Sequence, residues 1–122
     1  MKLSQIIEQI DGVLLTDNAD MDTEFTSAYS ADLLSDVLAL TKGHTLLITG
    51  TVSLQVIRVA EILGITAVIF IRGKMPPEEV IDAAKNKLDI PLVFTKKTMF
   101  ETSGILYKNG IRPCDNVPAD EV

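Results

Sequence analysis

The pattern of apolar residues at 45–73 predicts a strand, a helix and a second strand. Residues 45–49 (TLLIT) and 67–71 (AVIFI) are short continuous apolar runs, which is the pattern of strands covered on both faces. Between them, residues 53–63 carry a polar side chain at every third position, which predicts a mostly buried helix with one narrow polar stripe. We expect this βαβ unit to have a right-handed crossover.

Helical spacing and apolar runs, together with an alternating stretch at 24–30 and a capping box at 98–101, predict elements over the rest of the chain. Helices are expected at 3–10, 30–43, 75–88 and 98–108, and strands at 12–16, 24–30 and 90–95. Strands and helices that alternate in this way form an open α/β sheet. We therefore expect an open, mostly parallel sheet of about five strands with helices on both faces.

The length of 122 residues is typical of one domain. We expect residues 1–111 to form a single α/β domain. Residues 112–122 are polar, acidic and interrupted by two prolines, and we expect them to form a flexible acidic tail.

The helix expected at 30–43 has an apolar and a polar side. Asp32 and Asp36 are one turn apart on the polar side, where we interpret them as solvated carboxylates rather than as a metal or acid–base pair. Gly43 is expected to end the helix, with Lys42 well placed against the helix dipole. The residues expected to face the core are Leu33, Leu34, Val37, Leu38 and Leu40.

Two other helices carry start signals. Pro77 is expected at the first helical position of the helix at 75–88, because its missing N–H costs nothing there. Thr98 and Glu101 have the spacing of a capping box, which predicts that the last helix starts at this point.

Composition excludes several classes of function. The chain has 17 acidic and 11 basic residues, a net charge of −6 and only 5% aromatic residues. Nucleic-acid binding favours a basic face and aromatic platforms, so we expect no nucleic-acid partner. No apolar run approaches the roughly 18 residues of a membrane span, and the N-terminus carries charges, so we expect a cytoplasmic protein without membrane contact.

The sequence offers few residues for metal or thiol chemistry. Cys114 and His44 are the only cysteine and histidine, so neither an intramolecular disulfide nor a zinc site of the usual spacing is expected. Cys114 stands next to an acidic residue within the expected tail, which disfavours a reactive thiolate. We interpret His44 as a loop residue.

Three loops are expected to meet at the carboxyl ends of the strands, where open α/β sheets bind ligands. They span residues 49–53, 72–74 and 95–98, and each leads into a helix N-terminus, which favours anions. Four of the 11 basic residues lie in the last two loops. We expect a site for a small anionic metabolite or nucleotide. The candidate ligand-binding residues are Thr49, Gly50, Thr51, Ser53, Arg72, Gly73, Lys74, Thr95, Lys96 and Thr98.

A second interpretation of these loops stays open. Loops between strands and helices are commonly polar, and Ser53 and Thr98 have the residue type and position to do no more than cap their own helices. On that interpretation the chain is an adaptor whose partner is a larger enzyme.

Signals of catalysis are weak. The turn after residue 49 matches neither the dinucleotide-binding nor the P-loop glycine spacing, and no G-x-S-x-G segment occurs. The three loops contain no candidate general base. We expect a protein that is not an enzyme and needs no cofactor; the remaining alternative is phosphoryl or acyl chemistry by Thr51, Ser53 and the lysines.

The order of elements resembles the DRTGG domain, a family similar to the N-terminal domain of HPr kinase/phosphorylase. The resemblance runs from Gly12 to Gly110 and rests mainly on the stretch IPLVFTKKTMF, with Ile90, Pro91, Thr95, Thr98 and Phe100. The Asp and Arg that name the family would correspond to Thr51 and Val52. Its Thr-Gly-Gly would correspond to Ile71, Arg72 and Gly73, of which only Gly73 matches.

The resemblance implies a regulatory or interaction module rather than a catalyst. Domains of this family accompany phosphate acetyltransferases and CBS-domain pyrophosphatases, and free-standing copies are small accessory proteins, some near redox and hydrogenase systems. The resemblance therefore implies a self-associating protein, which we expect to be a homodimer. Such a protein would sense a ligand or bind a larger metabolic or redox enzyme.

Overall fold

The computed structural model describes residues 1–17, 19–40 and 44–114. The helices are α1 (Leu3–Gln9), α2 (Leu34–Leu40), α3 (Leu54–Leu63), α4 (Glu78–Ala83), which continues into a π-helical turn η1 (Ala84–Leu88), and α5 (Met99–Lys108). The strands are β1 (Val13–Leu14), β2 (Ser27–Ser30), β3 (Leu46–Thr49), β4 (Ala67–Phe70), β5 (Leu92–Phe94) and β6 (Arg112–Pro113).

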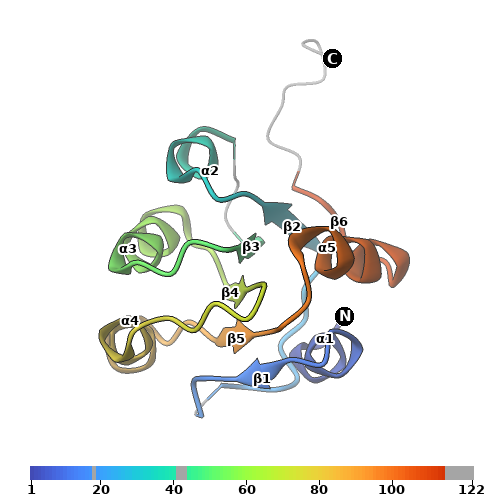
Figure 1. Ribbon diagram of the computed structural model, residues 1–122, viewed down its shortest axis with the longest axis horizontal. Coiled ribbons are helices and arrows are strands. Elements are labelled where there is room, and N and C mark those ends of the chain that lie inside the picture. Colours follow the sequence, from blue (N-terminus) through green and yellow to red (C-terminus); the bar gives the residue numbers. More distant parts are fainter. Residues whose placement is uncertain (18, 41–43, 115–122) are drawn as a thin grey trace.

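The strands form one open sheet in the order β1-β5-β4-β3-β2-β6 (Figure 1). All neighbouring pairs are parallel except β1 with β5, which is antiparallel. The predicted fold class is therefore confirmed. The described sheet has six strands rather than about five, because β6 adds to the edge beyond β2.

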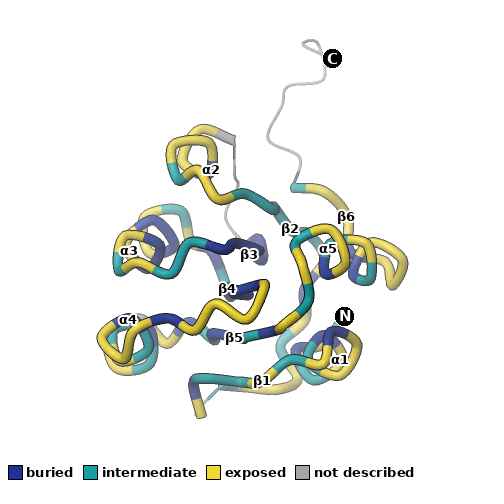
Figure 2. Tube along the Cα trace, viewed as in Figure 1, coloured by how far each residue is buried: buried dark blue, intermediate teal, exposed yellow. Residues whose placement is uncertain are grey.

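Helices cover both faces of the sheet. α2, α3 and α4 lie on one face, and α1 and α5 lie on the other (Figure 1). Successive residues of the central strands alternate between the two cores: Leu47 and Phe70 pack with α3, whereas Ile48 and Ile69 belong to the core that includes α1 and α5. β3 and β4 are thus buried along their whole length, as their continuous apolar runs predict (Figure 2).

The strand, helix and second strand of the predicted central βαβ unit are present. β3 and β4 pair in parallel, and α3 packs its apolar side against them. Gly64 ends α3 in the left-handed conformation, with φ of 70°, which an L side chain rarely adopts.

The predicted apolar side of α2 is partly wrong. Val37 is fully buried, but Leu33 and Leu38 are 60% and 47% exposed. α2 is the last helix in the layer formed by α2, α3 and α4. It packs against α3 on one side only, so part of its apolar surface remains uncovered (Figure 2). The side chain of Leu40 and the helix end expected at Lys42 and Gly43 lie outside the described residues.

The helix expected at 75–88 is present, with a different start. Pro77 has an extended ψ of 154° and precedes the helix as its N-cap, so the first helical residue is Glu78. Pro77 therefore lies one residue before the helix rather than at its first position, and the last turn is π-helical rather than α-helical.

The boundary expected at residue 112 is wrong. The Arg112 N–H donates to the Thr26 carbonyl at 2.9 Å and the Cys114 N–H donates to that of Ala28 at 3.0 Å, so residues 112–113 join the sheet as β6. Pro113 is tolerated there because an edge strand needs no donor on its outer side. Cys114 lies beside the sheet, where its sulfur accepts a hydrogen bond from Thr45 Oγ1 at 3.3 Å. Residues 115–122 lie outside the described part.

The capping box predicted at the start of α5 is confirmed. The Glu101 N–H donates to Thr98 Oγ1 at 3.2 Å, and the Thr98 N–H donates to Glu101 Oε1 at 3.2 Å. The hydrogen bonds from the Thr98 N–H and hydroxyl hold the pKa of Glu101 below its ordinary value.

Thr98→Ala is expected to lower the free energy of unfolding by about 1 kcal/mol, because the first-turn N–H of Glu101 loses its partner. Since the pKa of Glu101 is depressed on folding, its contribution is present above the unfolded-state pKa and is lost as the pH falls through the folded-state pKa. Urea unfolding at neutral and acidic pH measures both effects. Thr98→Ser keeps the acceptor and is expected to retain most of the stability; an equal loss in both variants would contradict the cap.

Candidate functional site

Two of the three predicted loops are joined by backbone hydrogen bonds. The Arg72 N–H donates to the Lys97 carbonyl at 2.8 Å, and the Gly73 N–H donates to the Thr95 carbonyl at 2.9 Å. The loops after β4 and β5 therefore form one continuous surface at the carboxyl ends of the strands, as parallel neighbours in the sheet require.

Arg72 is held in an uncommon backbone conformation. Its φ is 58°, and Gly73 follows with φ of 68°. A left-handed arginine has a steric cost that the surrounding structure must offset, and here the two hydrogen bonds to the neighbouring loop do so.

The Arg72 guanidinium extends back to the loop after β3. A Cβ atom placed on Gly50 would lie only 2.8 Å from Arg72 Nη2, so the guanidinium rests against the Gly50 backbone. Arg72 is exposed, and within the described part of the chain its side chain has no ion-pair partner. The third predicted loop thus joins the other two through this side chain.

Asp32 belongs to this cluster, although the sequence pattern did not place it there. It precedes α2 rather than lying on its polar side, and its Oδ1 accepts a hydrogen bond from the Gly50 N–H at 2.7 Å. The buried Thr49 hydroxyl donates to the same oxygen at 3.4 Å, and Thr51 Oγ1 donates to the Asp32 carbonyl at 2.8 Å. A signal was present, because Asp32 follows the expected strand at 24–30 and so belongs at its carboxyl end.

The side chains of the third loop point to a different place. Thr95 and Lys96 line a hollow of about 430 Å³ beside the β1 edge of the sheet, together with Asp11 and Glu101. Lys97 Nζ lies 3.5 Å from Asp11 Oδ2, and the buried Thr95 hydroxyl donates to the Ile10 carbonyl at 2.7 Å. The predicted residues therefore divide into two groups, one around Arg72 and one around Lys96, although their backbones touch.

The helix N-termini differ in what they offer an anion. At α5 the Glu101 carboxylate and the Thr98 hydroxyl already occupy the first turn. At α3, Ser53 stands in the N-cap position but its side chain makes no capping hydrogen bond. In the first turn of α3 the Val56 N–H donates to the Ser53 carbonyl at 3.1 Å. The N–H groups of Leu54 and Gln55 have no hydrogen-bond partner among the described residues and are therefore available to a ligand.

The cluster has the chemistry of anion binding. Arg72 supplies up to five donors in a planar fork, which suits phosphate or carboxylate oxygens. Lys74 is exposed in the same loop. In the described ranges, no group of three or more His, Cys, Asp and Glu side chains is arranged to hold a metal ion.

Comparisons with known proteins identify the fold. No family model matches the chain, and no curated protein sequence matches it. Among solved structures, it is similar to the CBS and DRTGG domains of the regulatory region of Clostridium perfringens pyrophosphatase, complexed with its activator diadenosine tetraphosphate. The TM-score is 0.73 at 18% identity, covering 99% of this chain and 49% of that one.

The chain therefore has a DRTGG-like α/β fold, as its resemblance to that family implies. It spans about half the length of the pyrophosphatase regulatory region that it matches. None of the helices in the described part is both long and apolar enough to cross a membrane. The binding role of the ten candidate residues remains a prediction.

Proposed function

We propose that this chain is a non-enzymatic regulatory domain that binds a small anionic metabolite or a nucleotide. The observation that carries the proposal is the Arg72 guanidinium, which rests on Gly50 at the carboxyl ends of the central strands without an ion-pair partner among the described residues. The fold supports it, because the similar pyrophosphatase region is a regulatory region complexed with a dinucleotide activator.

The charges around Gly50 indicate where the anion binds. The Asp32 carboxylate already accepts the Gly50 N–H, so an anion at that point would meet a like charge. The Arg72 guanidinium also reaches Gly50, and the first turn of α3 follows a few residues along the same loop. The ligand's phosphate or carboxylate therefore binds between Arg72 and the first turn of α3, with Asp32 limiting how much negative charge the site accepts.

A second candidate function is that of an adaptor that associates with itself or with a larger enzyme. Its specific support is the exposed apolar surface on two neighbouring helices: Leu33 and Leu38 on or next to α2, and Ile62 on α3, the last 73% exposed. Large apolar side chains that are exposed on neighbouring helices are candidates for a protein interface. A homodimer or a heteromeric partner would cover them.

Thermal unfolding at fixed low salt, against phosphate, nucleotides, dinucleotides and acetyl phosphate, tests the first proposal. A ligand at about 100 times its dissociation constant adds about 2.7 kcal/mol, which raises Tm by several degrees. Arg72→Ala is expected to abolish the rise, and Gly50→Ala to reduce it, because the added methyl displaces the guanidinium without changing the charge.

Lys108→Ala is the matched control, because it also removes one positive charge, but from the last residue of α5, whereas the loop at 95–98 precedes the first. It is expected to leave the ligand-induced rise in Tm unchanged. A flat response across the panel in the unaltered protein, or an equal loss in Arg72→Ala and Lys108→Ala, would contradict the anion site and favour the adaptor. Sedimentation of Leu38→Asp then tests whether the exposed face of α2 holds a second copy.

A further inference from the structure

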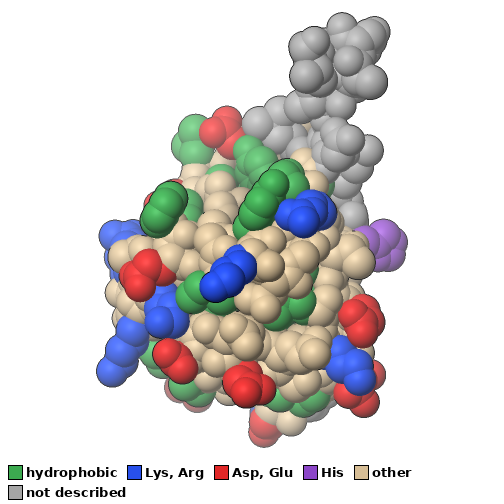
Figure 3. All heavy atoms as spheres, turned by 90° about the vertical axis from the view of Figure 1, so that its right-hand side faces the viewer, with side chains coloured by type: hydrophobic (Ala, Val, Ile, Leu, Met, Phe, Trp, Pro, Cys, Tyr) green, Lys and Arg blue, Asp and Glu red, His purple; other side chains and the backbone are tan. Residues whose placement is uncertain are grey.

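A cavity of about 300 Å³ lies between α5 and the strands β2 and β6, on the face opposite α3. Its floor is apolar and buried, formed by Ile48, Leu106 and Ile111. Because β6 lies within the segment expected to be a tail, the sequence pattern gives no sign of this cavity. In the space-filling view of this side of the molecule, hydrophobic side chains lie next to Lys and Arg side chains (Figure 3).

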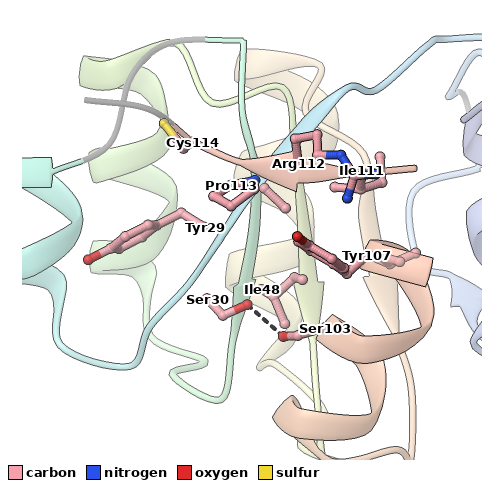
Figure 4. Close-up of a pocket in the computed structure, with 11 residues that line it drawn as sticks. Tyr29, Ser30, Ile48, Ser103, Tyr107, Ile111, Arg112, Pro113 and Cys114 are labelled. Atoms are coloured by element: carbon pink, nitrogen blue, oxygen red, sulfur yellow. Dashed lines mark hydrogen bonds between the residues drawn. The ribbon is translucent and has the colours of Figure 1, made fainter. Parts of the chain in front are cut away.

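The polar end of the cavity is a pair of serine hydroxyls. Ser30 Oγ at the carboxyl end of β2 and Ser103 Oγ on α5 are 2.7 Å apart (Figure 4). In such a pair one hydroxyl donates to the other, so one hydrogen and several lone pairs remain for a third group. The pair thus offers both a donor and acceptors at one point of an otherwise apolar surface.

The wall of the cavity is aromatic. Tyr107 extends from α5 toward Pro113 of β6 (Figure 4). The guanidinium carbon of Arg112 lies 4.6 Å from the centre of the Tyr107 ring, so the cation lies over one face of the ring and the other face stays open to a stacking partner. The side chain of Tyr107 remains 57% exposed.

We propose that this cavity binds a planar aromatic ring with a hydrogen-bonding edge, the chemistry of a nucleobase. A flat ring stacks on Tyr107 and covers the apolar floor, while its polar edge meets the hydroxyls of Ser30 and Ser103. The cavity is at the lower end of the range of about 300–1,000 Å³ for ligand sites, which suits one ring system rather than a whole nucleotide. This site stands independently of the anion site at Arg72.

The test is a titration of ¹⁵N-labelled full-length chain with adenosine, which carries the ring without phosphate. Chemical-shift changes are expected at the amides of Ser30, Ser103 and Tyr107. Tyr107→Ala is expected to weaken adenosine binding about ten- to hundredfold, the usual effect of removing a stacking partner of a base. Ser103→Leu is expected to block binding by filling the cavity.

Phe100→Ala is the matched control. Phe100 is on the same helix, two turns before Tyr107, and is 88% exposed outside the cavity. Its loss is expected to leave adenosine binding unchanged. The proposal is overturned if millimolar adenosine shifts no amide around the cavity, or if Phe100→Ala and Tyr107→Ala weaken binding equally.

A parallel titration with ribose 5-phosphate separates this proposal from the regulatory function. Phosphate binding around Arg72 without adenosine binding at Tyr107 would support the anion site and overturn the aromatic one. Adenosine binding at Tyr107 without any response around Arg72 would support the aromatic site and overturn the anion site.

Discussion

Phe70→Ala is expected to lower the free energy of unfolding by about 3–5 kcal/mol, the usual cost of emptying a fully buried phenylalanine site. Phe70 is 0% exposed in β4, between β3 and β5, and packs in the core that includes α3 and α4. Small domains are stable by only about 5–15 kcal/mol, so one substitution removes a large part of the total. Urea unfolding followed by far-UV circular dichroism measures it, since the chain has no tryptophan.

The same substitution is expected to loosen the anion site. Phe70 is the last residue of β4, its carbonyl accepts from the Thr95 N–H at 2.9 Å, and Arg72 follows two residues later. Phe100→Ala is the control of equal size, because that side chain is 88% exposed; it is expected to change stability by no more than about 0.5 kcal/mol. Equal losses for the two variants would contradict the burial of β4.

Asp32→Ala is expected to lower the free energy of unfolding by about 1–2 kcal/mol, because the Gly50 N–H and the buried Thr49 hydroxyl lose a charged acceptor. The value is at the lower end for charged hydrogen bonds because the Asp32 side chain is exposed and water replaces part of the interaction. Asp32→Asn keeps an acceptor oxygen and is expected to recover about half of the loss. Chemical denaturation of the three proteins under one buffer measures these differences.

Asp32→Ala also has an expected effect on the proposed ligand. Removing a negative charge beside Arg72 is expected to strengthen anion binding severalfold, whereas loss of Arg72 abolishes it. Asp36→Ala is the control, since it removes the same charge one turn further along the chain. If Asp36→Ala changed stability and binding as much as Asp32→Ala, the contacts of Asp32 would not be the cause.

The element order was predictable because it depends on local patterns. Continuous apolar runs identified β3 and β4, helical spacing identified α3, and the capping box identified α5 and placed its start at the observed residue. Each of these signals arises within one or two turns of chain, where backbone sterics and hydrogen bonding act between near neighbours.

The largest errors concern residues whose environment comes from distant parts of the chain. Leu33 and Leu38 have the spacing of core residues, yet α2 stands at the end of its layer and leaves them exposed. Arg112 and Pro113 have the composition of a tail, yet the open edge of β2 accepts them as a strand. In both cases the pattern describes the local segment, but the presence or absence of a neighbouring element decides whether its residues are exposed or join the sheet.

The candidate site shows the same division. The residues between the strands and helices were predictable as loops at the carboxyl ends of parallel strands. The sequence did not predict which side chains converge. Asp32 and Arg72, from two different loops, meet at Gly50 in a third, while Lys96 lines the hollow at the β1 edge. The cavity beside Tyr107 likewise exists only because β6 pairs with β2.

The sequence by itself thus determined the α/β class, the order of the main elements and the cap of α5, because propensity, hydrophobic periodicity and capping act over a few residues. The tertiary structure alone decided the sixth strand, the exposed side of α2 and the contacts around Gly50 and Tyr107. These depend on strand order and on the direction in which each loop directs its side chains. Both are set by packing between residues far apart in the chain, which no short pattern encodes.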